Sequence, residues 1–170
     1  MGAIGRHNYV GDDLTAGEAT AEVAHAAATW APVKAHAAKI GSAFNFRAQW
    51  DVPNFNAGTL TLRIRVGTAI TGDIVATIVW TPVLGEDAVL EGELIFEDDG
   101  AVGESEFHSS AEAWATGENV TRTILQDRTT IDTRAPWYFI PTTQWGTGHA
   151  DNDATLKSFR VWQVDAIERT

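Results

Sequence analysis

Trp50–Pro82 reads WDVPNFNAGTLTLRIRVGTAITGDIVATIVWTP and contains the clearest strand pattern in the sequence. In residues 59–66, apolar side chains alternate with Thr and Arg, which is typical of a strand with one buried face. Residues 74–80 are rich in β-branched side chains, which favour strands. Gly67 and Gly72 bound the short polar loop between the two runs. The stretch therefore predicts two antiparallel strands joined as a hairpin.

The same alternation recurs on both sides of this hairpin, in short segments separated by turn residues. Further strands are expected at residues 43–50, 90–97, 107–114, 120–125, 137–140 and 154–167. The last of these has apolar side chains on both faces, so we expect it to lie centrally in a sheet or beneath the N-terminal segment. Seven or eight such strands predict a mainly β fold, an antiparallel β-sandwich of jelly-roll type.

Residues 1–42 differ from the rest of the chain, because they are rich in Ala, His and Gly and show no convincing alternation. Alanines in residues 20–29 favour a helix, but Val23 is the only larger apolar residue there, so such a helix has little to bury. We therefore predict an N-terminal arm at residues 1–42, extended or partly helical, and a β-sandwich domain at residues 43–170. Tyr9, Val23 and Trp30 are the expected anchors of this arm on a neighbouring molecule.

Composition limits the classes of partner. A chain of 170 residues, 44% of them apolar, is long enough to bury one sizeable core. Its formal net charge of −11 repels a phosphate backbone and an anionic membrane surface, so we expect neither nucleic acid nor a membrane as a partner. No apolar stretch is long enough to span a bilayer, and no secretory signal is visible. The absence of cysteine excludes disulfides and thiolate chemistry.

Residues that carry catalytic or metal chemistry are scattered along the sequence. The histidines occur without metal-ligand spacing at positions His7, His25, His36, His108 and His149. Ser109 and Ser110 follow His108, but no G-x-S-x-G elbow surrounds them. Paired carboxylates are plentiful, and their spacing singles out no catalytic pair. We therefore expect no catalytic residue, no metal site and no cofactor, and the chain is not expected to be an enzyme.

The run Asp151-Asn152-Asp153 begins like a calcium loop but lacks the glycine and the distal glutamate of an EF-hand. A turn capped by aspartate side chains is the expectation there, and binding of Ca²⁺ or Na⁺ is the alternative.

Residues 86–106 carry acidic side chains and neither Lys nor Arg. Glu91, Glu93 and Glu97 lie on the expected polar face of a strand in this span. Two interpretations stay open: this is a solvated surface, or it docks onto a basic patch of a partner protein.

The order W-x-VP-x-F-x-AGTLTLRIRV, followed by a glycine-bounded loop and TGDIVATIVW, resembles a β-sandwich module of structural proteins from tailed viruses. The late segments PWYFIP, DNDATLK and FRVWQVDAIE are similar to the closing hairpin of that module. Asp153, Thr155 and Leu156 match part of its pattern, whereas its Arg-Asp pair is absent. The resemblance covers residues 43–168 and leaves the arm out.

This resemblance implies a virion component, located on the virion, that is not an enzyme. The expected function is a decoration or auxiliary (cement) protein on the outer face of a tailed-virus head, a homotrimer whose partners are the major capsid protein or other virion proteins. The alternative is a receptor- or glycan-binding module of a tail or head fibre. In that case exposed Trp114, Trp137 and Trp145 are the expected stacking platforms for sugar rings.

Overall fold

The computed structural model describes residues 6–17, 20–102, 105–115, 121–128 and 131–164, with the backbone alone at residues 16 and 121–128. The strands are β1 (Arg6–Ala16), β2 (Val23–Ala24), β3 (Ala31–Val33), β4 (Ala43–Asn54), β5 (Leu60–Gly67), β6 (Asp73–Trp80), β7 (Glu86–Asp98), β8 (Glu106–Ala115), β9 (Thr121–Arg128), β10 (Trp137–Trp145) and β11 (Asp153–Val164). A single turn of 3₁₀ helix, η1 (Ala27–Thr29), separates β2 from β3. Within the described ranges no helix is long and apolar enough to cross a membrane.

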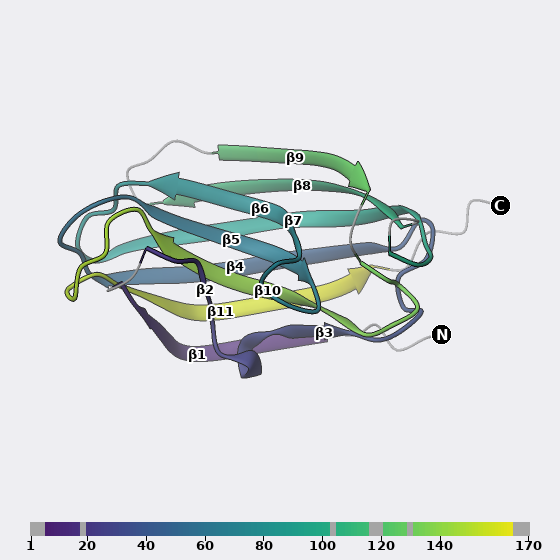
Figure 1. Ribbon diagram of the computed structural model, residues 1–170, viewed down its shortest axis with the longest axis horizontal. Helices are drawn as coiled ribbons and strands as arrows, with labels where there is room; N and C mark the ends of the chain where they lie inside the picture. The colour runs from purple at the N-terminus through teal and green to yellow at the C-terminus, as the bar shows by residue number, and fades with distance from the viewer. Residues whose placement is uncertain (1–5, 18–19, 103–104, 116–120, 129–130, 165–170) are drawn as a thin grey trace.

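The strands form two antiparallel sheets that face each other (Figure 1). The six-stranded sheet has the order β1-β11-β4-β7-β8-β9, and the other sheet has the order β2-β10-β5-β6, with β3 paired to β10 beside β2. If β2 and β3 count as one interrupted strand, and the β8–β9 hairpin as an insertion, eight strands remain. In chain order they form sheets 1-8-3-6 and 2-7-4-5, which is jelly-roll topology. The predicted β-sandwich of jelly-roll type is confirmed.

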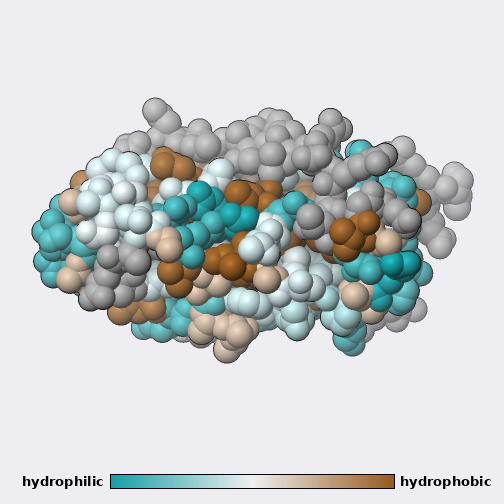
Figure 2. All heavy atoms as spheres, in the orientation of Figure 1, coloured by the Kyte–Doolittle hydropathy of each residue, from teal (hydrophilic) through white to brown (hydrophobic). Residues whose placement is uncertain are grey.

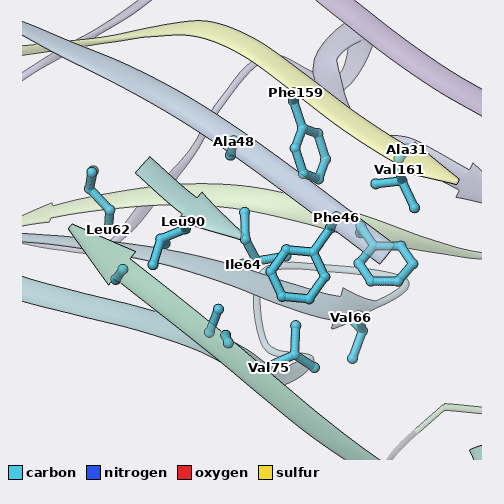
Figure 3. Close-up of a cluster of buried hydrophobic side chains, with 14 of the residues drawn as sticks. Ala31, Phe46, Ala48, Leu62, Ile64, Val66, Val75, Leu90, Phe159 and Val161 are labelled. Atoms are coloured by element: carbon cyan, nitrogen blue, oxygen red, sulfur yellow. The ribbon is translucent and has the colours of Figure 1, made fainter. Parts of the chain in front are cut away.

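The core lies between the two sheets. Side chains that alternate along β4 and β5, such as Phe46, Ala48, Leu62 and Ile64, point inward from opposite sheets (Figure 3). Each is at most 1% exposed. Burial of a large apolar side chain contributes roughly 1.5–3 kcal/mol before entropy is subtracted. The apolar residues of the period-two pattern therefore lie on the inner faces of the sandwich. The β5–β6 hairpin forms as predicted.

The N-terminal segment differs from the predicted arm, because its described part belongs to the sandwich. β1 pairs with β11 from the Arg6–Trp162 pair to the Ala16–Asp153 pair, with a β-bulge between Val10 and Asp13. β2 and β3 pair with β10 and supply the second strand of the jelly roll. The sequence did not reveal these strands, because backbone hydrogen bonds hold them and few large side chains mark their inner face.

Two of the three expected arm anchors contact this chain itself. Tyr9 packs against the hydrophobic core. The indole Nε1–H of Trp30 donates a hydrogen bond of 2.8 Å to the carbonyl oxygen of His25, and its ring packs edge-on against Tyr138. The prediction that these two side chains anchor an arm on a neighbouring molecule is therefore wrong. Val23 is 43% exposed on β2, so it stays a candidate contact residue.

A polar cluster ties the segment before β2 to the outer face of the five-stranded sheet. The carboxylate of Glu22 accepts hydrogen bonds of 2.8 and 2.7 Å from Nε and Nη2 of Arg65, and a further bond from the Thr142 hydroxyl. Arg63 lies 3.2 Å from the same carboxylate. Burial opposes the charged form, but these hydrogen bonds and charges lower the pKa of Glu22 overall. Figure 2 views this side of the molecule, where hydrophilic atoms lie among hydrophobic ones.

β10 is longer than predicted, because it continues through Pro141 to Trp145. A proline inside a sheet removes one ladder hydrogen bond. Here the second jelly-roll strand is interrupted between β2 and β3, and the backbone N–H of His25 donates to the Pro141 carbonyl oxygen at 3.1 Å. The strand therefore accommodates its proline beside a gap in its neighbour.

We predict that deletion of residues 1–42 abolishes folding. The deletion removes the first two jelly-roll strands, leaves β11 and β10 without one neighbour each, and takes Ala31, Val33 and Ala38 out of the core. Circular dichroism with a thermal melt, run beside the full-length chain, should show loss of the cooperative transition. A truncated chain that keeps the circular dichroism signal of β-strands and melts cooperatively would contradict this role for the N-terminal strands.

Candidate functional site

Of the histidines, His25 has the most organised surroundings. Its ring is 1% exposed, and Nδ1 lies 2.8 Å from Oδ2 of Asp13 on β1. Its Nε2 lies 2.9 Å from the Thr143 hydroxyl on β10 and 3.0 Å from the indole Nε1 of Trp50 on β4. The same Asp13 oxygen accepts a hydrogen bond from the backbone N–H of Ala26. The cluster therefore joins the N-terminal segment to strands of both sheets.

These contacts fix the protonation of His25. The indole of Trp50 can only donate, so Nε2 must accept, and the ring proton lies on Nδ1, where it is donated to Asp13. Burial lowers the pKa of His25 from its ordinary value, and the Asp13 carboxylate opposes this shift without reversing it. The ring is therefore neutral at neutral pH.

The aspartate, histidine and hydroxyl of this cluster are the groups of a nucleophilic triad, but their setting is structural. Thr143 is 2% exposed, and the histidine nitrogen that faces it also receives the Trp50 N–H. A nucleophile must reach substrate, and a general base needs a free lone pair. We therefore assign the cluster to stability and look for the functional site on the surface.

The Asp151–Asp153 loop is held by Asn152. Its side-chain carbonyl accepts hydrogen bonds from the backbone N–H groups of Asn56 and Ala57, and its amide donates to the carbonyl oxygens of Ala57 and Thr147. Asp153 accepts a 2.7 Å hydrogen bond from the side chain of Asn54. In the described part of the chain, no group of three His, Asp or Glu side chains is placed to hold a metal ion.

Trp137 and Trp145 are not surface platforms. They are 1% and 2% exposed, so the expectation that they stack on sugar rings is wrong. Trp137 packs among core aromatic rings, including Phe139, and Trp145 stacks against Phe55. Trp114 is half-buried on β8, with the guanidinium carbon of Arg47 5.8 Å from the centre of its ring. The residue type alone did not predict whether these tryptophans are exposed. Both lie on the inward face of β10, because side chains alternate between the two faces of a strand.

The acidic residues between positions 86 and 106 lie partly in the interior and partly on the surface. Glu86 is buried and accepts hydrogen bonds from the Trp80 indole and the Val83 backbone N–H. Glu91 and Glu93 are half-buried on the outer face of the six-stranded sheet, and Glu97 is exposed at the end of β7. Glu91 forms an ion pair of 3.4 Å with Arg47. Neither a solvated face nor a docking surface therefore describes the whole span.

A hollow of about 480 Å³ lies on the outer face of the six-stranded sheet, and we call it the outer groove. Strand register places Trp162, Asn45, Glu93 and Ser110 side by side on β11, β4, β7 and β8. These four side chains are all half-buried. The groove is lined by Asn45, Phe46, Glu91, Gly92, Glu93, Ser110, Glu112 and Trp162. One aromatic ring, one amide, one hydroxyl and several carboxylates therefore meet on one open surface.

Sequence reasoning identified two residues of the outer groove, Glu91 and Glu93, and missed Trp162, Asn45 and Ser110. The signal for Trp162 was present, because β11 carries apolar residues on both faces and only one face can be core. Asn45 and Ser110 gave no signal of their own. They join the groove through the register of four strands, which residue spacing does not encode.

No protein-family model and no curated protein matches this chain. Among solved structures it is similar to a peanut lectin with a nine-residue peptide, at 9% identity and a TM-score of 0.47, covering 96% of this chain and 93% of that one. It is also similar to a Lotus tetragonolobus seed lectin, at 10% identity and a TM-score of 0.47, covering 94% and 98%. A PL-14 alginate lyase from Aplysia kurodai is similar at 10% identity and a TM-score of 0.44, covering 74% and 70%. These TM-scores are below 0.5, so the assignment of the fold rests on the strand order given above.

We predict that acidification below pH 6.5 destabilises the protein through His25. The folded state keeps the ring neutral, whereas the unfolded state takes up a proton below its pKa of about 6.5, so stability falls with pH by up to about 1.4 kcal/mol per pH unit. In His25→Gln the amide can still donate to Asp13 and accept from Trp50, but it cannot titrate. The variant should therefore show a flatter dependence of melting temperature on pH between 7 and 5.

His108→Gln is the matched control, because His108 is half-buried on β8 and is not part of the His25 cluster. Its melting profile should follow that of the original chain. Some pH dependence should survive in His25→Gln, since burial also lowers the pKa of His7. A full pH dependence in His25→Gln would contradict the assignment.

Proposed function

We propose that this protein is a carbohydrate-binding module and that the outer groove is its site. The observation that carries the proposal is the convergence of Trp162, Asn45, Glu93 and Ser110 from four adjacent strands on one hollow. A pyranose ring presents an apolar C–H face and a rim of hydroxyls. The indole of Trp162 can stack on the C–H face, and the amide, carboxylate and hydroxyl can form hydrogen bonds with the sugar hydroxyls.

The size and position of the groove support a ligand that extends across the strands. Neighbouring strands lie about 4.8 Å apart, so the groove from β11 to β8 is about 14 Å wide, enough for a short oligosaccharide. Its floor is made by sheet strands, which hold the polar groups in fixed positions. A rigid surface of this kind reduces the entropy cost of binding a flexible sugar chain.

The proposal is for binding without cleavage. Hydrolysis of a glycosidic bond needs two carboxyl groups that flank the scissile bond, one as acid and one as base or nucleophile, with room for the attacking water. Glu91 and Glu93 project from the same face of one strand, and Glu112 is exposed on the next strand. This arrangement supplies hydrogen-bond acceptors for hydroxyl groups rather than an acid and a nucleophile.

We predict that Trp162→Ala weakens oligosaccharide binding by at least about tenfold, because loss of a stacking ring removes both its buried area and its ring contact. A glycan array that includes both neutral and acidic oligosaccharides should identify ligands of the original chain, and isothermal titration calorimetry should then measure the affinity of both proteins. Melting curves of the two proteins should be recorded to confirm that the variant is folded.

Trp114→Ala is the matched control, since Trp114 is half-buried on the same sheet face but does not line the groove. It should bind with nearly the original affinity. An array without hits, or equal losses in the two variants, would contradict the proposed site.

A place on the virion of a tailed virus is the second candidate, and the two functions are compatible. Exposed apolar side chains on edge strands favour assembly: Val10 and Leu14 on β1 are 68% and 57% exposed, and Val79 on β6 is 57% exposed. An open edge with apolar side chains invites pairing with another chain. A neighbouring copy or the major capsid protein would cover such edges, as a homotrimeric decoration protein requires.

We predict that the protein forms a homo-oligomer, with a trimer expected, and co-sediments with capsids of a tailed virus. Mass photometry measures the first and sedimentation with purified heads the second. Val10→Lys places a charge on the β1 edge and should reduce assembly, whereas Lys34→Gln, at an exposed site beyond β3, should not. A strict monomer that leaves capsids unbound would remove this second candidate.

A further inference from the structure

A second hollow, of about 560 Å³, adjoins the outer groove at the β1 side of the same sheet. We call it the arginine hollow, and its lining residues are Arg6, His7, Asn8, Arg160, Val161 and Trp162. Trp162 lines both hollows. On β1, Arg6 is paired with Trp162, and Asn8 is paired with Arg160. The groove therefore continues past the tryptophan onto a surface of opposite charge.

The two arginines of this hollow differ from the other described arginine side chains. Neither Arg6 nor Arg160 forms an ion pair with a described residue, although the chain has a net charge of −11. Ion pairs are formed by Arg47, Arg63, Arg65 and Arg134. Arg6 and Arg160 are diagonal neighbours on adjacent strands, where such residues lie roughly 7–8 Å apart and their Cβ atoms somewhat closer. Both guanidinium groups can therefore reach one oxyanion placed between them.

We propose that the arginine hollow binds the acidic substituent, a carboxylate or a sulfate, of the saccharide that occupies the outer groove. This inference rests on the proposed function and specifies its ligand class. The guanidinium groups of Arg6 and Arg160 donate to the oxyanion, and Asn8 supplies an amide donor beside them. Trp162 stacks on the sugar at the junction, and Asn45, Glu93 and Ser110 bind the hydroxyls of the neutral residues that follow.

The opposite charges at the two ends give the ligand one orientation. Arg6 and Arg160 attract the acidic end, whereas Glu93 repels it from the other end of the groove. The net charge of the protein disfavours small free anions, because they gain only the arginine contacts. A saccharide gains the stacking and hydroxyl contacts as well, which makes an acidic oligosaccharide the preferred anion.

The test compares three oligosaccharides of equal length and backbone: neutral, uronate-terminated and sulfated. Calorimetry with the full-length protein at low salt should show about tenfold tighter binding of at least one acidic form, as expected for charge-assisted hydrogen bonds at an exposed site. Raising the salt concentration should reduce this preference and leave neutral binding nearly constant. The acidic ligand that binds more tightly identifies the preferred substituent, carboxylate or sulfate.

Arg160→Gln should lose most of the preference for acidic forms and keep the affinity for the neutral form. Arg160→Lys should keep part of it, because lysine retains the charge without the bidentate fork. Lys34→Gln is the charge-matched control and should keep the full preference. Trp162→Ala should weaken the binding of all three ligands, since the Trp162 ring lines both the outer groove and the arginine hollow.

The outcomes separate this inference from the proposed function. If neutral saccharides bind and acidic ones bind no more tightly, the arginine hollow is not an anion site and the inference is overturned, while the proposed function stands. A preference that persists unchanged in Arg160→Gln overturns it equally. If no saccharide of any charge binds, both are overturned. Binding confined to an acidic form is the extreme of the expected preference and supports the inference.

Discussion

The buried hydrogen bonds of His25 hold strands of both sheets together. A buried imidazole is costly unless both nitrogens are satisfied, and its partners here come from β1, β4 and β10. These partners can meet only when the N-terminal segment crosses between the edges of both sheets. Each unsatisfied group would cost about 1–3 kcal/mol, so the cluster selects this one path of the chain over others that bury the same apolar residues.

That path determines where the candidate site lies. Once Asp13 is fixed beside His25, β1 pairs along β11, and β11 becomes an inner strand of the six-stranded sheet between β1 and β4. Its inward side chains, including Phe159, then complete the core, and the alternate position Trp162 must face outward. The outer groove and the arginine hollow both depend on this tryptophan, so the buried cluster and the surface site share one structural origin.

Much of the sandwich could be predicted from the sequence because burial in a sheet follows period two, as in residues 59–66 of β5. The prediction failed for β1, where Val10 and Leu14 point outward and backbone pairing with β11 carries the contact. It failed again for Trp137 and Trp145, because residue type does not say which face of a strand is inside. For the site, Glu91 and Glu93 were accessible to sequence reasoning, but Trp162, Asn45 and Arg6 come together only through register. Pairing between distant strands is set by the whole fold rather than by any local pattern.

Charge is distributed unevenly over the outer face of the six-stranded sheet, and this distribution has a physical consequence. Along two adjacent cross-strand rows, arginines occupy β1, β11 and β4, whereas glutamates occupy β7 and β8. Arg47 and Glu91 form an ion pair where the two regions meet, so these two charges offset each other, whereas Arg6, Arg160 and Glu93 form no ion pair with a described residue. A face of this kind presents little net attraction at long range and strong directional preference at short range, because unpaired ends act only on a ligand that spans them. Recognition there depends on the arrangement of charges along the ligand, and an extended chain with one acidic end matches that arrangement.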